Sequence, residues 1–250
     1  MRKVILTATV IVVGLLAIPW LGCGDAQPAD GEKTGQSSQE GAYEPAIVPD
    51  DFVAVVDNEY YPLAAGTTYI YQSSTDEGIE RVEIFVTGEK KEILGIQCSV
   101  VRDTVTIDGE VAELTLDWFA QDKDGNVWYF GEDSKEYENG EVSSTQGSWE
   151  AGVDGAQPGI IMQAHPVVGE EYRQEYDAGN AEDMAEVVSL GEAVSVPTGS
   201  YTACLKTREW TPLEPGVTEF KYYAPGIGLI LETAGASESQ RLELVEIEPG

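Results

Sequence analysis

Residues 112–131 read AELTLDWFAQDKDGNVWYFG and set the expected fold class. From Ala112 to Ala120, apolar residues at every second position alternate with Glu113, Thr115, Asp117 and Phe119. A period of two over nine residues places one face of a strand on a core. Asp124-Gly125 follows as a turn signal, and a second β-rich run begins at Val127. This stretch predicts two antiparallel strands joined by a tight hairpin.

The rest of the chain after Phe52 repeats this pattern of short β-rich runs between turns. The runs are Thr67–Gln72, Val82–Val86, Ile96–Ile107, Val187–Pro197, Tyr201–Trp210, Val217–Ala224, Ile227–Leu231 and Arg241–Ile247. Turn signals include Asp108-Gly109 and Asn139-Gly140. Helical candidates are short, such as Ala181 to Glu186, and none carries a long stripe with caps. We therefore predict an all-β, mainly antiparallel protein.

The two halves of the chain carry similar landmarks in the same order. Pro62 and Pro166 precede hydrophobic runs, and Cys98 and Cys204 follow about 36 and 38 residues later. Asp117-Trp118-Phe119-Ala120 and Lys221-Tyr222-Tyr223-Ala224 come about 20 and 18 residues beyond each cysteine. Self-similarity of this kind predicts repeated architecture. We expect two related β-meanders, at about 60–131 and 165–232, with an insert at about 132–164. Together they form one curved sheet or barrel in a single domain, residues 49–250.

The N-terminal segment has the pattern of an export signal. Arg2 and Lys3 precede an apolar stretch from Val4 to Leu21. The tetrapeptide Trp20-Leu21-Gly22-Cys23 resembles the lipobox of bacterial lipoproteins, in which the cysteine carries the lipid. We expect residues 1–22 to be a signal peptide, Cys23 to be the lipid attachment site and residues 23–48 to form a disordered tether. The alternatives are a permanent transmembrane helix and cleavage after Ala26, which would release a soluble exported protein.

Cysteine content bears on the same question. With Cys23 lipidated, Cys98 and Cys204 remain as an even pair in an oxidising compartment, where a disulfide is permitted. The alternative is two small thiols buried in a strand-rich core.

The charge balance limits the partners. The chain has 45 acidic and 14 basic residues, a net charge of −31, and removal of residues 1–22 makes it −33. Nucleic-acid binding requires Lys and Arg, so a nucleic acid is an unsuitable partner. With 5 Trp, 12 Tyr and 5 Phe, the chain is unlike disordered acidic proteins, which lack large side chains to bury. Acidic residues are also so common here that a local carboxylate pair does not by itself indicate catalysis.

Two segments carry candidate ligand-binding residues. Asp122, Asp124 and Asn126 alternate as in the first half of an EF-hand loop and would offer oxygens to calcium. Val127 replaces the glycine of that loop, and the alternative is a tight hairpin turn.

The second segment is the irregular stretch Gly147–Gly159. Trp149, Glu150 and Asp154 in this loop would line a ligand mouth, and the alternative is a loop that plugs the end of a barrel with Trp149. The single histidine, His165, lacks partners for a triad or a zinc site and is expected on the surface.

One long motif carries a family resemblance. Residues 117–132, DWFAQDKDGNVWYFGE, together with residues 147–162 and 222–229, resemble a group of uncharacterised exported bacterial lipoproteins over nearly all of Phe52–Glu248. The resemblance implies export and lipidation and no particular activity. A more distant likeness to the LolA/LolB lipid carriers of the periplasm implies a curved sheet, and a fold does not determine function.

From these features we expect an exported lipoprotein of the cell envelope, anchored to a bacterial membrane, that acts as a non-catalytic binding or carrier module. The expected ligand is small and apolar and lies between the two repeats, an envelope protein is the other candidate partner, and no cofactor is expected. The alternatives are a hydrolase that uses carboxylates near Glu150 and Asp154, and a structural module stabilised by calcium.

Overall fold

A computed structural model of the chain describes residues 43–75, 78–235 and 238–250. The expected signal peptide, the lipid attachment site Cys23 and most of the expected tether lie outside these residues. Among the described residues, the model has no helix with the length and apolar character needed to cross a membrane.

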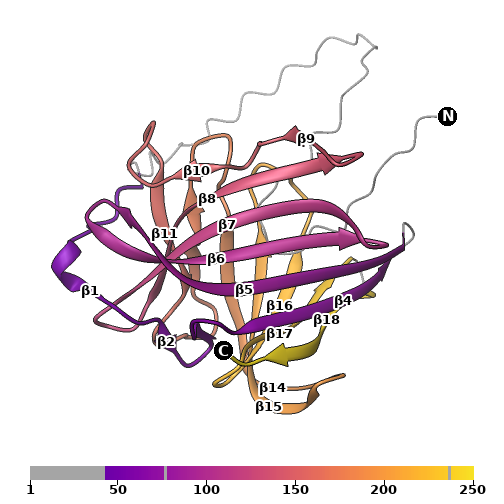
Figure 1. Cartoon of the computed structure of the whole chain (residues 1–250). Helices are drawn as coiled ribbons and strands as arrows, with labels where there is room; N and C mark the ends of the chain where they lie inside the picture. Colours follow the sequence, from indigo (N-terminus) through magenta and orange to yellow (C-terminus); the bar gives the residue numbers. More distant parts are fainter. Residues whose placement is uncertain (1–42, 76–77, 236–237) are drawn as a thin grey trace, which may run out of the picture.

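Two antiparallel meanders make up most of the structure, as predicted. The first consists of β4 (Thr68–Thr75), β5 (Gly78–Ile93), β6 (Ile96–Ile107), β7 (Glu110–Asp122) and β8 (Val127–Glu138). The second consists of β14 (Met184–Val196), β15 (Gly199–Trp210), β16 (Glu219–Ala224), β17 (Gly228–Ala234) and β18 (Gln240–Glu248). Within each meander every strand pairs with the next one in sequence, and β18 pairs with β4 to join the two. The result is a single strongly curved sheet (Figure 1).

Short elements complete the sheet and cover one end of it. They are η1 (Pro49–Asp51), β1 (Phe52–Val53), β2 (Asp57–Asn58), β3 (Tyr61–Pro62), β9 (Glu141–Ser144), β10 (Trp149–Glu150), β11 (Gln157–Met162), β12 (Glu171–Arg173) and β13 (Glu175–Tyr176). β12 pairs with β14, and β13, which begins two residues after β12 ends, pairs with β11. Since β11 also pairs with β8, the segment from β12 to β13 brings the sheet round to a nearly closed barrel.

Glycine permits the close approach at this closure. A Cβ atom at Gly159 in β11 would overlap the backbone of Gln174, which lies between β12 and β13. Gly131 in β8 has a φ of 128°, and a Cβ atom there would overlap the backbone of Trp149 in β10. β8 continues past Gly131 to Glu138, so residue 132, the expected start of the insert, lies inside a strand. Within residues 132–164, the end of β8 and strands β9, β10 and β11 belong to the sheet.

The turns follow the sequence signals closely. Asp108-Gly109 joins β6 to β7, and Asn139-Gly140 joins β8 to β9, with positive φ at all four residues.

The prediction of a short helix from Ala181 to Glu186 is wrong. β14 begins at Met184 and Ala181 forms an isolated antiparallel bridge with Asp177, because pairing with β15 outweighs a weak local preference.

The fully buried face of β7 is the polar one. Thr115 and Asp117 are 0% and 6% exposed, whereas Leu114 and Leu116 on the other face are only half-buried. The strand period predicted from the sequence is confirmed, and the polar residues point into the barrel.

The barrel interior has an apolar wall and a polar wall. Buried aliphatic side chains from β5, β6, β15 and β18 form the apolar part, including Val82, Val86, Val101, Val105, Leu205, Leu242 and Leu244. Buried carboxylates, hydroxyls and one ammonium from β7, β8 and β15–β17 form the polar part, together with Glu80 in β5 and Asp103 in β6.

The hairpin of β2 and β3 covers the end of the barrel where β7 terminates (Figure 1). Gln121 Oε1 accepts hydrogen bonds of 2.9 Å from the backbone N–H groups of Asp57 and Asn58. The Tyr61 ring lies 5.4 Å from the ring of Phe119. These contacts close that end of the interior.

Candidate functional site

The most unusual feature of the interior is a group of buried carboxylates. Asp117 in β7 and Glu132 in β8 are directly opposite each other across the ladder and are 6% and 1% exposed. The Tyr129 hydroxyl lies 2.7 Å from Asp117 Oδ1 and 3.0 Å from Glu132 Oε2. A phenol has one proton to donate, so it cannot satisfy both carboxylates at once.

Asp103 and Glu175 extend this group, and we call these two residues with Asp117 and Glu132 the Asp117 cluster. Asp103 and Glu175 are 3% and 0% exposed. The Trp149 indole N–H donates a 2.9 Å hydrogen bond to Glu175 Oε2. Three other carboxylate oxygens in the cluster are buried without a hydrogen-bond partner: Asp103 Oδ1, Glu132 Oε1 and Glu175 Oε1.

Burial shifts the titration of the whole cluster upward. It raises the pKa of Asp117 to about 7, although the hydrogen bond from Tyr129 opposes the shift. Burial, with the neighbouring charges of Asp117 and Glu175, raises the pKa of Glu132 well above its ordinary value. The pKa values of Asp103 and Glu175 are also raised, chiefly by burial. At neutral pH the carboxyl groups of the cluster are therefore either protonated or balanced by a positive charge nearby.

A second charged group, the Lys221 cluster, lies in the other meander. Lys221 in β16 is 8% exposed, and its Nζ lies 2.7 Å from Glu209 Oε2 in β15. Glu232 in β17 is directly opposite Lys221, and Glu219 completes the cluster. Burial alone would lower the pKa of the Lys221 ammonium, but Glu209, Glu232 and Glu219 outweigh it and the pKa is raised. The ammonium is therefore charged.

The two clusters occupy corresponding places in the two meanders. Cys98 lies in β6 and Cys204 in β15, and Asp103 and Glu209 each follow their cysteine by five residues. Asp117 and Lys221 begin the two matching tetrapeptides of the sequence. The register agrees with this correspondence, because Glu132 is opposite Asp117 and Glu232 is opposite Lys221. Where the second meander has an ammonium, the first has another carboxylate.

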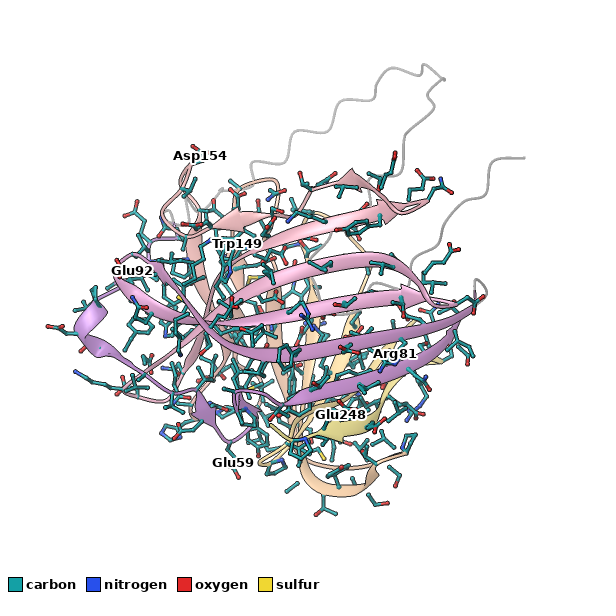
Figure 2. The ribbon with its side chains drawn as sticks, viewed as in Figure 1. Glu59, Arg81, Glu92, Trp149, Asp154 and Glu248 are labelled. Carbon is teal, nitrogen blue, oxygen red and sulfur yellow. The ribbon has the colours of Figure 1, made fainter. Side chains whose placement is uncertain are left out.

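The three residues of the expected ligand loop point in different directions. Trp149 is buried and directed toward Glu175, with its ring 5.4 Å from that of Tyr129. Glu150 Oε2 lies 2.7 Å from Lys91 Nζ, which also sits 3.1 Å from the centre of the Trp118 ring. Asp154 is exposed at the tip of the loop (Figure 2). Of the three, the structure places Trp149 at the Asp117 cluster.

The expected calcium segment forms a hydrogen-bonded turn. Asp122 Oδ1 accepts from the backbone N–H of Asn126, and Oδ2 accepts from the Asn126 amide and the Trp128 indole, at 2.8 to 2.9 Å. Asp124 is exposed. In the described ranges, no group of three or more His, Cys, Asp or Glu side chains is arranged to hold a metal ion.

Cys98 and Cys204 carry free thiols in the structure. Both are 0% exposed, and burial raises the pKa of Cys98 to about 12 and also raises that of Cys204. Each occupies a core position in its own meander. The expected surface residue His165 is exposed.

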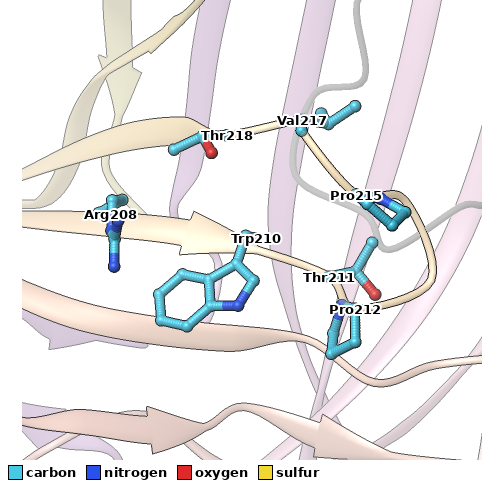
Figure 3. Close-up of a pocket in the computed structure, with 8 residues that line it drawn as sticks. Arg208, Trp210, Thr211, Pro212, Pro215, Val217 and Thr218 are labelled. Atoms are coloured by element: carbon cyan, nitrogen blue, oxygen red, sulfur yellow. The ribbon is translucent and has the colours of Figure 1, made fainter. Parts of the chain in front are cut away.

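A surface pocket of about 420 Å³ lies beside the loop from β15 to β16 (Figure 3). Its walls are Arg208 and residues 210–212 and 215–218, with Trp210, two prolines and Val217 as the apolar part. The Arg208 guanidinium stacks at 4.7 Å over Trp210 and bonds to Glu186 Oε2 at 2.7 Å. Because the Arg208 guanidinium is already paired with Glu186, this pocket is a less distinctive candidate for a ligand-binding site than the interior clusters.

Sequence reasoning missed both clusters. Acidic residues are frequent throughout the chain, so Asp117 and Glu132 did not stand out. The signal that could have found them is the charge difference between the matching tetrapeptides, which begin with Asp117 and Lys221.

No family model and no curated protein matches this sequence. Two solved structures are similar in part. One is a "putative exported protein with YmcC-like fold" from Bacteroides fragilis NCTC 9343, with 18% identity, a TM-score of 0.44 and coverage of 76% of this chain and 98% of that chain. The other is a "putative lipoprotein" from Parabacteroides distasonis ATCC 8503, with 13% identity, a TM-score of 0.37 and the same coverages. Both TM-scores are below 0.5, so we infer neither fold nor function from them.

Proposed function

We propose that this protein is an exported, lipid-anchored binding protein of the cell envelope that holds a positively charged ligand inside its barrel without catalysing a reaction. The observation that carries the proposal is the Asp117 cluster. Its carboxylates are buried, three of their oxygens lack partners, and none of the ion pairs formed by the described residues involves a member of this cluster.

The energetic reasoning starts from the cost of a buried charge. An ionised carboxylate without a partner is strongly unfavourable in a protein interior, and the usual compensation is a counter-charge or protonation. In the Lys221 cluster the fold supplies that counter-charge. In the Asp117 cluster a bound cation would supply it at neutral pH. The sequence suggested a small apolar ligand, whereas these buried carboxylates favour a cationic one, which we propose here.

Export and lipid attachment at Cys23 are supported by the sequence of residues 1–23 and by the resemblance to exported lipoproteins. Mass measurement of the membrane-extracted protein tests this part. The expected mass is that of residues 23–250 plus the lipid groups, whereas a lipid-free mass starting after Ala26 would contradict anchoring.

The calcium alternative has its own test. Because both oxygens of Asp122 already accept hydrogen bonds within the turn, we expect a chelator to leave the melting temperature unchanged. A drop on chelation that calcium reverses would favour the calcium module instead.

Ligand charge is tested by thermal melting of the full-length protein in detergent. At pH 7.5 and constant ionic strength, organic ammonium ions and Ca²⁺ are compared with acetate and glucose. A ligand that binds only the folded state raises the melting temperature. We expect concentration-dependent stabilisation by at least one cation that is lost in Glu132→Gln and kept in Asp133→Asn, a half-exposed residue on the same strand. Stabilisation by none of the cations would contradict the proposal.

A further inference from the structure

We infer that the Asp117 cluster is a binding site for the primary ammonium group of an organic ligand, which occupies the place that Lys221 fills in the other meander. This inference rests on the proposed function and specifies the group that is recognised.

The first support is the Lys221 cluster itself. There the fold places a primary ammonium among three carboxylates: Glu209 at 2.7 Å, Glu232 on the neighbouring strand and Glu219 on its own strand. The corresponding residues around Asp117 include Asp103 for Glu209 and Glu132 for Glu232. The first meander thus repeats two of the carboxylates and replaces the lysine by an aspartate.

The second support is independent of this correspondence. Asp103, Glu132 and Glu175 are each more than nine-tenths buried, and each has one carboxylate oxygen without a partner. A primary ammonium carries three N–H donors, as many as the unpartnered oxygens of the cluster. The side-chain donors already present, the Tyr129 hydroxyl and the Trp149 indole, are neutral and engage other oxygens of Asp117, Glu132 and Glu175. Backbone N–H groups, also neutral, donate to Asp103 and Glu175. The cluster has hydrogen-bond donors and lacks a positive charge.

The third support is a polar route along β7 and β8. Glu113 and Glu136 are paired across the ladder and half-buried, Thr115 and Ser134 come next, and Asp117 and Glu132 follow. Thr115 Oγ1 lies 3.0 Å from Ser134 Oγ and 3.0 Å from Glu113 Oε1. Thr115 and Ser134 are 0% and 1% exposed, so the ladder is closed in the ligand-free structure and the ammonium group would displace these side chains as it enters. Since the β2–β3 hairpin covers the opposite end, we place the entry at Glu113 and Glu136, whose carboxylates attract a cation.

The experiment compares two probes by isothermal titration of the full-length protein in detergent at pH 7.5 and constant ionic strength. n-Butylammonium has three N–H donors, and tetramethylammonium has the same charge and none. We expect n-butylammonium to bind at least tenfold more tightly. Asp117→Asn and Glu132→Gln, which keep shape and remove charge, should each weaken binding at least tenfold. Asp133→Asn, which removes a charge from the same strand outside the cluster, should change it less than twofold.

The outcomes separate the two proposals. If both probes, or Ca²⁺, bind equally well and Glu132→Gln abolishes binding, the cationic ligand stands and the ammonium inference is wrong. If n-butylammonium binds selectively but Asp117→Asn and Glu132→Gln leave its affinity unchanged, the site assignment is wrong. If no cation binds, both proposals fail.

Discussion

The Asp117 and Lys221 clusters lie at corresponding positions of two meanders, and a lysine in the second occupies the place of an aspartate in the first. In both, carboxylates from neighbouring strands project into the barrel interior. The Lys221 cluster contains its own cation, 2.7 Å from Glu209. In the Asp117 cluster the corresponding residue is an acid, and three buried oxygens lack partners, against one, Glu232 Oε2, in the Lys221 cluster. One framework of strands therefore holds an internal ion pair in one half and, in the other, buried carboxylates without a counter-charge, where we propose that a cation binds.

The largest expected effect comes from removing the built-in cation. Lys221→Met leaves Glu209, Glu219 and Glu232 without their counter-charge, and loss of one partner of a buried pair costs about 3–5 kcal/mol. Urea unfolding at pH 7.5 measures this loss. Lys135→Met, which breaks the more exposed pair with Asp133, should cost about 1 kcal/mol or less. Equal losses of unfolding free energy for the two variants would contradict the distinction between the buried and the exposed ion pair.

The next effect is a dependence of stability on pH. The pKa of Asp117 is raised by burial to about 7 in the folded state, above the ordinary value of about 3.9 for an unfolded chain. Between these values the folded state binds more protons, so the stability it contributes is present at low pH and is lost as pH rises through about 7.

We therefore expect Asp117 alone to lower the free energy of unfolding of the ligand-free protein by on the order of 2 kcal/mol between pH 5 and pH 7.5. Other buried acids add to this fall, because burial also raises the pKa values of Glu80 and Glu219 to about 7. Glu238, whose pKa is lowered to about 2, chiefly by Tyr222, is ionised throughout this range and adds no slope. Urea titrations at both pH values provide the measurement. Asp117→Asn should reduce the fall by about this amount, and an unchanged slope in this variant would contradict the raised pKa of Asp117.

A smaller effect is expected at the edge of the Asp117 cluster. Trp149→Phe keeps an aromatic ring beside Tyr129 but removes the indole donor to Glu175. Loss of a buried hydrogen bond that leaves its acceptor unsatisfied costs about 1–3 kcal/mol. Trp128→Phe is the matched control, because its indole bonds to the half-buried Asp122, which keeps other donors. Urea unfolding measures both variants, and a greater loss of stability in Trp128→Phe than in Trp149→Phe would contradict the account.

The local structure was largely predictable from the sequence, and the interior was not. The run Ile96–Ile107 coincides with β6, because its β-branched residues and the Asp-Gly turn that follows are local signals. The buried face of β7 depends on how the sheet curves, so alternation alone could not show that Asp117 points inward and Leu116 outward. Proximity of Asp103, Glu132 and Glu175 depends on pairing between β7 and β8 and on the closure through β13, which no local pattern encodes.

The central claim is that the Asp117 cluster lacks the cation that Lys221 provides in the other half, and Asp117→Lys tests it most directly. The measurement is the free energy of unfolding at pH 7.5 without ligand, compared with Glu141→Lys, an exposed site on β9 with the same change in net charge. We predict that Asp117→Lys is more stable than Glu141→Lys and no longer responds to n-butylammonium. A protein less stable than Glu141→Lys that still responds to n-butylammonium would contradict the claim.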